Sequence, residues 1–374
     1  MTDIKVPFLP LERITASYGN ALADNLLCTV RSGWYLNGER LGLFERDFAR
    51  WTGASHCIGV GNGLDALTLA LMAMKAEQGW GDDAEVVVPA MTFVATAQAV
   101  ARAGLVPVAA DVDERALLTA QAAEQVLTSR TRVLLPVHLY GQMAPMDELS
   151  DLARQRGLMV LEDAAQAHGA ALRGRKAGAW GHMAAFSFYP GKNLGALGDA
   201  GAVTTDSEAL AQRVRMLANY GADRKYHHVA LGMNSRMDEV QAAVLATKLP
   251  RLEADNEARR RVADFYASHL ANPLVRKPLP PVQREAHVYH IYAVRCDERD
   301  RLQQHLAQQG IQTLMHYPFM LPEQPALAPW MGTENASRFP HAADWARCEL
   351  SLPIHPCMSE EECRLVVEAV NDFA

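Results

Sequence analysis

Residues 133–163 read VLLPVHLYGQMAPMDELSDLARQRGLMVLED, and this stretch decides the fold that the sequence predicts. The apolar run Val133 to Val137 is typical of a buried strand. Apolar residues then recur at helical spacing over Met146 to Arg156, and Met159-Val160-Leu161 predicts a second strand. A strand, a helix and a strand in this order are the building unit of a parallel sheet.

The same alternation extends outward from this unit over about residues 57–205. Further strands are predicted at Cys57 to Val60, Val86 to Val88, Val106 to Ala109, Met183 to Phe186 and Ala202 to Thr204. Further helices are predicted at Leu64 to Ala76 and Thr96 to Ala103. We therefore predict an α/β fold, with a mostly parallel sheet and helices on both of its faces.

The pattern changes after about Asn234. Two long helices are predicted, at Met237 to Glu253 and Glu257 to His269, and a proline-rich stretch follows them. A strand at His290 to Val294 and a helix at Arg299 to Gln309 come next. We interpret residues 1–250 as a large α/β domain and residues 251–374 as a smaller C-terminal α+β domain.

Composition narrows the classes of partner. The formal net charge is -7, which argues against binding of nucleic acid. The six cysteines have no zinc-ligand spacing, so no metal site is predicted. The N-terminus, MTDIKVPFLPLERI, does not have the pattern of a signal peptide, and no apolar stretch approaches a membrane span. We expect a cytoplasmic protein with no membrane partner.

Polar residues follow the predicted strands where these end. They are Asp111, Asp113, His138, Glu162 and Asp163. Ligands of open α/β sheets bind beyond the carboxyl ends of the strands, so the functional site is expected there.

The segment Phe186 to Asn193, FSFYPGKN, carries a lysine just past a strand end. Lys192 follows the turn at Pro190-Gly191 and is placed to project into a cleft. Burial lowers the pKa of a lysine and makes its amine a nucleophile that can form a Schiff base. The alternative is a solvated surface lysine, which is the commoner fate of this residue type.

Asp163 ends the strand that begins at Met159. A buried carboxylate is costly unless it has a partner, and a pyridinium nitrogen would be a suitable one. The alternative is a helix N-cap without chemistry.

Gly59 to Leu67, GVGNGLDAL, joins a strand end to a helix start. Backbone N–H groups at a helix start bind anions, and glycines let a phosphate approach closely. The alternative is a tight turn before an ordinary helix.

Taken together, these segments resemble the DegT/DnrJ/EryC1/StrS family of sugar aminotransferases over nearly the full chain. The matching segments are Ser32 to Leu36 with Phe44-Glu45, Gly61 to Leu67, Pro89 to Thr96, Pro136 to Gly141, Glu162 to Gln166, Ser187 to Asn193 and Gly232 to Met237. Their order and spacing are more specific than any one of the motifs.

The resemblance implies the aspartate-aminotransferase fold, fold-type I of the pyridoxal-phosphate (PLP) enzymes, as a homodimer with two shared active sites. Lys192 would carry the cofactor and move protons, with a pyridoxamine phosphate form in between, and Asp163 would pair with the pyridine nitrogen. The other implied cofactor contacts are Gly63 and Leu64 (backbone amides) with Ser187 at the phosphate, Phe93 on the ring, Gln166 at the phenolic oxygen, and Asn234 from the partner subunit. On physical grounds alone, Phe93 could be a core aromatic and Asn234 a turn residue.

The resemblance is nearest to the group that acts on TDP-linked 3-keto-6-deoxyhexoses. Leu64 and Asp199 differ from the Thr or Ser and the Glu of other members, and this weakens a C4-specific assignment. L-Glutamate is the expected amino donor. Candidate contacts to the nucleotide sugar are Tyr189, Lys225, His316 and Tyr317. A 4-keto sugar and a UDP-linked N-acetyl 3-keto sugar stay open as alternatives.

Two other functions remain to be weighed. Related PLP-dependent sugar dehydratases carry His where the Schiff-base lysine belongs, so Lys192 argues against that reaction. A non-enzymatic regulator is disfavoured by the acidic charge and by the absence of a helix-turn-helix pattern.

Overall fold

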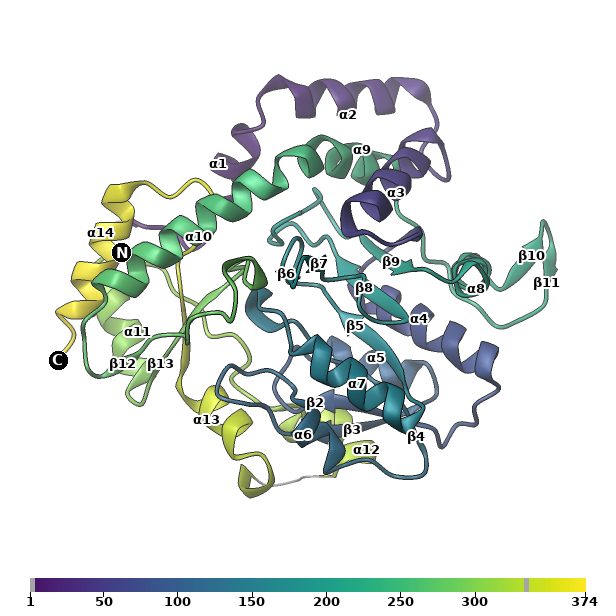
Figure 1. Cartoon of the computed structure of the whole chain (residues 1–374). Coiled ribbons are helices and arrows are strands. Elements are labelled where there is room, and N and C mark those ends of the chain that lie inside the picture. The colour runs from purple at the N-terminus through teal and green to yellow at the C-terminus, as the bar shows by residue number, and fades with distance from the viewer. Residues whose placement is uncertain (1–3, 333–335) are drawn as a thin grey trace.

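A seven-stranded sheet forms the centre of the chain in the computed structural model, which describes residues 4–332 and 336–374 (Figure 1). Its strand order is β1-β9-β8-β5-β4-β2-β3. The strands are β1 (His56–Val60), β2 (Glu85–Pro89), β3 (Val106–Ala110), β4 (Thr131–Leu134), β5 (Met159–Asp163), β8 (Met183–Ser187) and β9 (Gly201–Thr205). The neighbouring strands β8, β5, β4, β2 and β3 are all parallel to one another. Strand β9 runs antiparallel to its two neighbours, β1 and β8.

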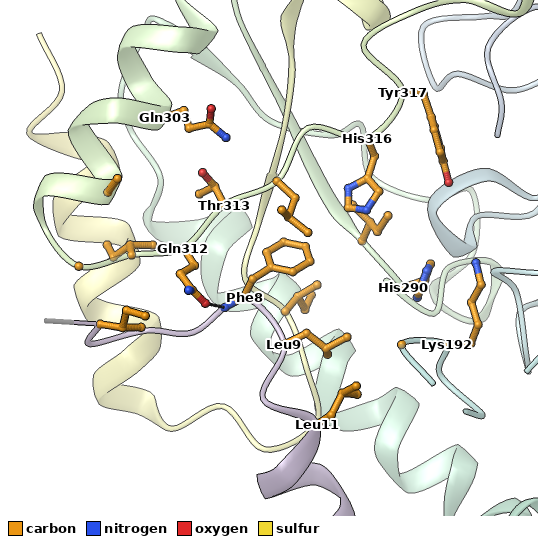
Figure 2. A pocket seen from close by; sticks show the side chains of 18 of the residues that line it. Phe8, Leu9, Leu11, Lys192, His290, Gln303, Gln312, Thr313, His316 and Tyr317 are labelled. Atoms are coloured by element: carbon orange, nitrogen blue, oxygen red, sulfur yellow. Dashed lines mark hydrogen bonds between the residues drawn. The ribbon is translucent and has the colours of Figure 1, made fainter. Parts of the chain in front are cut away.

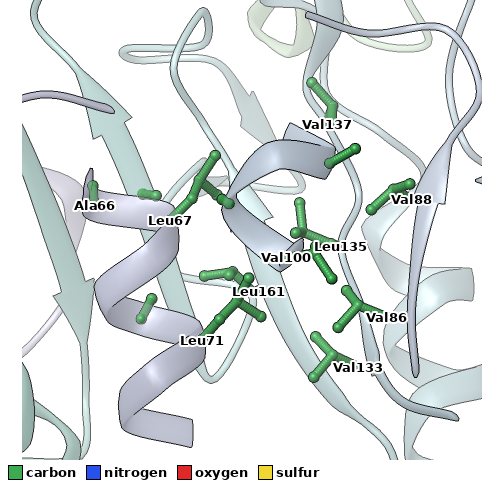
Figure 3. Close-up of a cluster of buried hydrophobic side chains, with 14 of the residues drawn as sticks. Ala66, Leu67, Leu71, Val86, Val88, Val100, Val133, Leu135, Val137 and Leu161 are labelled. Atoms are coloured by element: carbon green, nitrogen blue, oxygen red, sulfur yellow. The ribbon is translucent and has the colours of Figure 1, made fainter. Parts of the chain in front are cut away.

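Successive residues of each strand face opposite sides of the sheet, so the valine-rich strands supply two cores. Val86 and Val88 of β2 pack in one apolar cluster, whereas Val87 between them packs in the other. Figure 3 shows part of the first cluster, where Leu67 and Leu71 meet Val100 and the strand residues. Full burial of each such side chain contributes about 1.5–3 kcal/mol.

Helices cover both faces. The first cluster contains side chains of α4 (Gly63–Gln78), α5 (Ala95–Arg102) and α8 (Glu208–Ala218). The second contains side chains of α3 (Glu39–Thr52), α6 (Ala120–Glu124), α7 (Met146–Arg156) and α9 (Glu239–Lys248). The N-terminal helices α1 (Leu11–Ala16) and α2 (Asn20–Ser32) precede α3, and α2 lies along α9 (Figure 1).

A third cluster belongs to the C-terminal part of the chain. It lies around a three-stranded antiparallel sheet of β12 (Val275–Arg276), β13 (Tyr292–Cys296) and β14 (Glu349–Leu352). The helices α10 (Leu252–His269), α11 (Arg299–Gln308) and α14 (Glu360–Asn371) pack on this sheet, and Val6 from the N-terminal segment joins them. The segment that includes α12 (Ala328–Met331) and α13 (Pro340–Cys348) instead contributes Met320 and Trp345 to the first cluster.

Short elements complete the described chain. They are the two-stranded pairs β6 (Ala171–Leu172) with β7 (Arg175–Lys176) and β10 (Ala222–Arg224) with β11 (His227–His228), and the 3-10 turns η1 (Leu139–Gly141), η2 (Leu249–Arg251), η3 (Arg284–Ala286), η4 (Leu321–Glu323), η5 (Pro325–Leu327) and η6 (Ala336–Arg338).

The predicted α/β class is confirmed, and all the strands predicted between residues 57 and 205 are present. One predicted end was wrong, because β4 ends at Leu134 instead of Val137. Pro136 has no N–H to donate to a neighbouring strand, so the regular ladder ends before it.

Two predictions in the C-terminal half were also wrong in detail. The helix expected from Met237 to Glu253 is interrupted by η2, where Pro250 breaks the helical hydrogen bonds, and the second helix already begins at Leu252. The strand expected at His290 begins at Tyr292, because Tyr289 has a left-handed backbone with φ of 46° and turns the chain there.

Within residues 4–332 and 336–374, the helices are too short or too polar for any of them to span a bilayer. The domain boundary at residue 250 stays a prediction.

Candidate active site

The N-terminus of α4 approaches the end of β8 very closely. A Cβ atom added to Gly63 would lie 2.6 Å from the Cβ of Ser187. Asn62 caps the helix, since its side chain accepts a hydrogen bond of 2.8 Å from the amide of Asp65. Amides of the first helical turn have no partner inside the helix. Gly63, Leu64 and the Ser187 hydroxyl therefore form a cradle of hydrogen-bond donors suited to an anion.

Lys192 lies one turn beyond the end of β8. Its amide donates to the carbonyl of Tyr189 over 2.8 Å, which closes the turn through Pro190 and Gly191. Burial lowers the pKa of the Lys192 amine to about 8, against the opposing effect of the Asp163 charge. Lys192 is thus not the fully solvated lysine of the alternative interpretation. Its amine loses its proton at a lower pH than an ordinary lysine does, and the neutral amine is the nucleophilic form.

Asp163 is buried at the end of β5, with 6% of its surface exposed. Its carboxylate accepts hydrogen bonds from the Thr96 hydroxyl over 2.9 Å and from the Ala165 amide over 3.2 Å. Burial raises the pKa of Asp163 even though both hydrogen bonds and the charge of Lys192 lower it. A cationic or N–H-bearing ligand beside this carboxylate would offset the cost of its burial.

Gln166 is held between two tyrosines. Its Oε1 accepts from the Tyr140 amide over 2.6 Å, and its Nε2 donates to the Tyr317 hydroxyl over 2.7 Å. The rings of Tyr140 and Tyr317 are nearly parallel, at 9°. Phe93 lies 5.8 Å from the Tyr317 ring and is 55% exposed, so it is not the core aromatic of the alternative interpretation.

Glu162, the neighbour of Asp163, is buried and serves the scaffold. Its carboxylate accepts hydrogen bonds from the amides of Gly178, Trp180 and Gly181 and contacts His138 Nε2 at 2.9 Å. The Ala144 amide donates to His138 Nδ1, so Nε2 carries the proton and donates to Glu162. This network fixes the strand end that presents Asp163.

A cavity of about 1090 Å³ opens beside Lys192 (Figure 2). Tyr189, His290, His316 and Tyr317 line it together with Lys192. Its other walls consist of Phe8, Leu9 and Leu11 from the N-terminal segment and of residues around Gln303 and Gln312. Its size suits a ligand larger than an amino acid.

His316 points into this cavity and is held from behind by β14. Its Nδ1 lies 2.8 Å from the Ser351 hydroxyl, and its amide donates to Glu349 over 2.6 Å. Burial lowers the pKa of His316 to about 4. At neutral pH its side chain is uncharged, so it fits a sugar hydroxyl better than a pyrophosphate.

Lys225 and Asn234 do not line the cavity beside Lys192 within one chain. Lys225 lies between β10 and β11, in a hairpin that projects from the body beside α8 (Figure 1). Its Nζ lies 5.0 Å from the centre of the Tyr226 ring. Asn234 is exposed and forms a backbone bridge to Asn219.

Two of the strand-end carboxylates serve other purposes. Asp111 accepts from the amides of His341 and Ala342 at the start of α13, and Asp113 accepts from the amides of Arg115 and Leu117 in a turn. Both stabilise local structure.

Sequence reasoning did not single out Thr96 and His290. Thr96 belongs to the segment Pro89 to Thr96, which was recognised only as a motif. The sequence pattern predicts His290 as the first residue of a strand. Its place beside Lys192 depends on a chain reversal that sequence patterns do not reveal.

A mostly parallel sheet with a partly buried lysine, a buried carboxylate and the close approach of a helix start at its edge is typical of an enzyme of the PLP-dependent transferase fold. The comparisons with known proteins agree. A model of the DegT/DnrJ/EryC1/StrS aminotransferase family matches residues 17–371. The chain therefore belongs to this family of aminotransferases.

Individual relatives match over almost the whole chain. The dTDP-3-amino-3,6-dideoxy-alpha-D-galactopyranose transaminase of Aneurinibacillus thermoaerophilus is 44% identical, over 98% of this chain and 99% of its own. The dTDP-3-amino-3,4,6-trideoxy-alpha-D-glucose transaminase of Streptomyces venezuelae is also 44% identical, over 99% and 96%. The solved structure of S. venezuelae DesV matches with a TM-score of 0.93 at 43% identity, over 99% of this chain and 98% of that one.

Proposed function

We propose that this chain transfers an amino group from L-glutamate to a nucleotide-linked keto sugar, most specifically a TDP-linked 3-keto-6-deoxyhexose. The observation that carries the proposal is the meeting, at one end of the sheet, of the Lys192 amine, the Asp163 carboxylate and the Gly63–Ser187 cradle, with a large cavity beside them. The names of the two 44%-identical relatives support a TDP sugar aminated at C3.

The residues fit pyridoxal 5′-phosphate. Gly63 has no side chain, and a Cβ there would collide with Ser187, so the start of α4 can approach the end of β8 closely. The amides of Gly63 and Leu64 and the Ser187 hydroxyl would together hold the phosphate at this approach. Asp163 would pair with the pyridine nitrogen, and Phe93 would pack on the ring. Gln166 would bond the phenolic oxygen through the Nε2 that donates to Tyr317 in this structure.

The cofactor, when bound, supplies an electron sink for the carbon that loses or gains a proton. The chain supplies the proton transfer. Near pH 8 about half of the free Lys192 amines are neutral, and this form would take a proton from the Cα of the amino donor. In the second half of the reaction it returns a proton to the sugar carbon. Asp163 would place a negative charge beside the cofactor nitrogen and so favour its protonated form.

The acceptor would occupy the cavity. Its sugar would lie beside Tyr189, His316 and Tyr317, which line the cavity, with the neutral His316 as a hydroxyl partner. Lys225 of the partner subunit is the candidate cation for the pyrophosphate. Asn234 of the partner subunit would reach the cofactor phosphate.

The substrate is tested by supplying L-glutamate with a TDP-linked 3-keto-6-deoxyhexose, its 4-keto isomer and a UDP-linked N-acetyl 3-keto sugar in parallel. We expect turnover of the first. Turnover of the 4-keto or of the UDP-linked compound alone would contradict the C3 or the TDP assignment. Turnover of none, with free keto acids accepted instead, would contradict the sugar proposal.

A further inference from the structure

His290 lies beside Lys192 in the cavity wall and has no role in the site as assembled above. Both side chains line the same cavity and point into it side by side (Figure 2). His290 comes from the loop that precedes β13, and Lys192 from the loop that follows β8. The sequence pattern predicts no functional role for the His290 side chain.

A hydrogen-bond chain behind His290 determines which ring nitrogen carries the proton. Asn193 Nδ2 lies 3.1 Å from the carbonyl of Val288 and 2.9 Å from the side-chain oxygen of Asn256. Asn256 in turn donates its own Nδ2 to the carbonyl of His168 over 2.8 Å. Backbone carbonyl oxygens only accept hydrogen bonds, so the side-chain nitrogens of Asn193 and Asn256 must be the atoms that face them. The side-chain oxygen of Asn193 therefore faces His290.

Asn193 Oδ1 lies 3.2 Å from His290 Nδ1. An amide oxygen accepts, so Nδ1 of His290 carries the hydrogen and donates it. Burial, reinforced by the charges of Lys192 and Arg259, holds the pKa of His290 well below its ordinary value. The ring is therefore neutral, and its Nε2 presents a bare lone pair.

In this structure the two side chains line one cavity without a hydrogen bond between them. We propose that His290 is a positioning residue for Lys192: its Nε2 accepts one hydrogen of the Lys192 amine once the amino donor has displaced that amine and the lysine takes part in proton transfer. A free lysine amine has two hydrogens, one lone pair and rotational freedom about its last bond. Donation of one N–H to His290 restricts this rotation and turns the lone pair toward the carbon whose proton it takes. The proposal rests on the aminotransferase function but not on the identity of the sugar.

The tautomer is tested without turnover. The nitrogen shifts of the His290 ring, measured by ¹⁵N NMR on the full-length protein with ¹⁵N-labelled histidine, report which nitrogen is protonated, and His290→Gln assigns the signal. We expect a neutral ring with a protonated Nδ1 and a bare Nε2 between pH 6 and pH 8, the range around neutrality in which an ordinary imidazole titrates. A ring protonated at Nε2, or at both nitrogens, would overturn the proposal.

The consequence for Lys192 is tested with L-glutamate alone, with and without deuterium at Cα, by following the cofactor absorbance in a single turnover. His290→Phe should slow this half-reaction about 100-fold, as expected for a misplaced reacting group, and should enlarge the deuterium isotope effect. His290→Gln, which offers an acceptor oxygen near the position of Nε2, should recover at least about a tenth of the wild-type rate.

His287→Gln is the matched control, because His287 is a buried histidine three residues away that does not line the cavity. It should leave the rate and the isotope effect unchanged. A rate of His290→Phe within about twofold of the wild type, or an equal loss in His287→Gln, would overturn the positioning role. Because the sugar is absent from this assay, a wrong sugar assignment cannot produce either result.

Discussion

At the residue scale, Lys192 must be both buried and able to lose its proton. Below pH 8 the folded apoprotein holds the partly desolvated Lys192 ammonium near Asp163, His290 and His316, at a cost in free energy that the solvated ammonium of the unfolded chain does not have. The chemistry of the site therefore lowers the stability of the protein that carries it.

We predict that Lys192→Met stabilises the apoprotein at pH 7 by on the order of 2 kcal/mol. Between the folded pKa of about 8 and the ordinary value of 10.5, the folded wild type has released a proton that the unfolded chain still binds. The free energy of unfolding of the wild type then rises with pH relative to the variant, so the advantage of Lys192→Met shrinks in this window.

The measurement is a series of melting curves of both apoproteins from pH 6 to pH 10. Lys5→Met, at an exposed lysine, is the control and should show no such trend. An advantage of Lys192→Met that is absent at pH 7, or that grows above pH 8, would contradict the lowered pKa.

At the element scale, the position of α4 against β8 creates the anion cradle. Two glycines allow this close contact. A Cβ on Gly63 would collide with Ser187, and a Cβ on Gly201 would lie 2.4 Å from the backbone of Asn62. The helix start, the strand end and the strand neighbour β9 thus meet with no space for side chains. This packing aims the first amides of α4 at the position of the predicted phosphate.

We predict that Gly63→Ala weakens binding of pyridoxal phosphate by about 1–3 kcal/mol, because the new Cβ would lie 2.6 Å from Ser187 Cβ and force α4 away from β8. Equilibrium titration of the apoprotein with the cofactor measures the change. Gly42→Ala is the matched control: Gly42 lies inside α3, and a Cβ there would have no neighbour within 4 Å. It should raise stability by about 0.5–1 kcal/mol and leave cofactor affinity unchanged. Equal affinities of both variants would argue against the cradle.

At the scale of the whole molecule, Lys225 and Asn234 do not line the cavity beside Lys192 within one chain. Large apolar side chains near these two residues are exposed, with Tyr226 at 85% and Leu231 at 93%. Exposed apolar side chains beside polar groups are typical of an interface, which agrees with the predicted homodimer.

We predict that Lys192→Ala and Asn234→Ala chains complement each other at limiting cofactor. In a mixed dimer with two-fold symmetry, one site receives both lesions and the other receives none. After complete subunit exchange at equal concentrations, about a quarter of the wild-type activity should appear. The experiment needs native mass spectrometry to verify the exchange. If the exchanged mixture gains no activity over the two separate variants, the sites are not shared.

Much of this molecule follows from local sequence patterns. The valine-rich runs predict the central strands, and the helix at Met146–Arg156 has the predicted bounds. Lys192, Asp163 and Gly63 are recognisable because each lies at or just after a strand end, where parallel sheets bind ligands. Proline and left-handed residues account for the errors, since Pro136 and Pro250 interrupt regular hydrogen bonding and Tyr289 turns the chain.

The sequence by itself determined the fold class and the residue types of the chemistry, because both depend on periodicity and on short spacings. Only the tertiary structure decided how those residues are supported. Thr96 reaches Asp163 across 67 positions of the chain, and Asn193 reaches Val288 across 95. The proton position on His290 and the neutral state of His316 depend on such contacts and on burial, which no local pattern encodes.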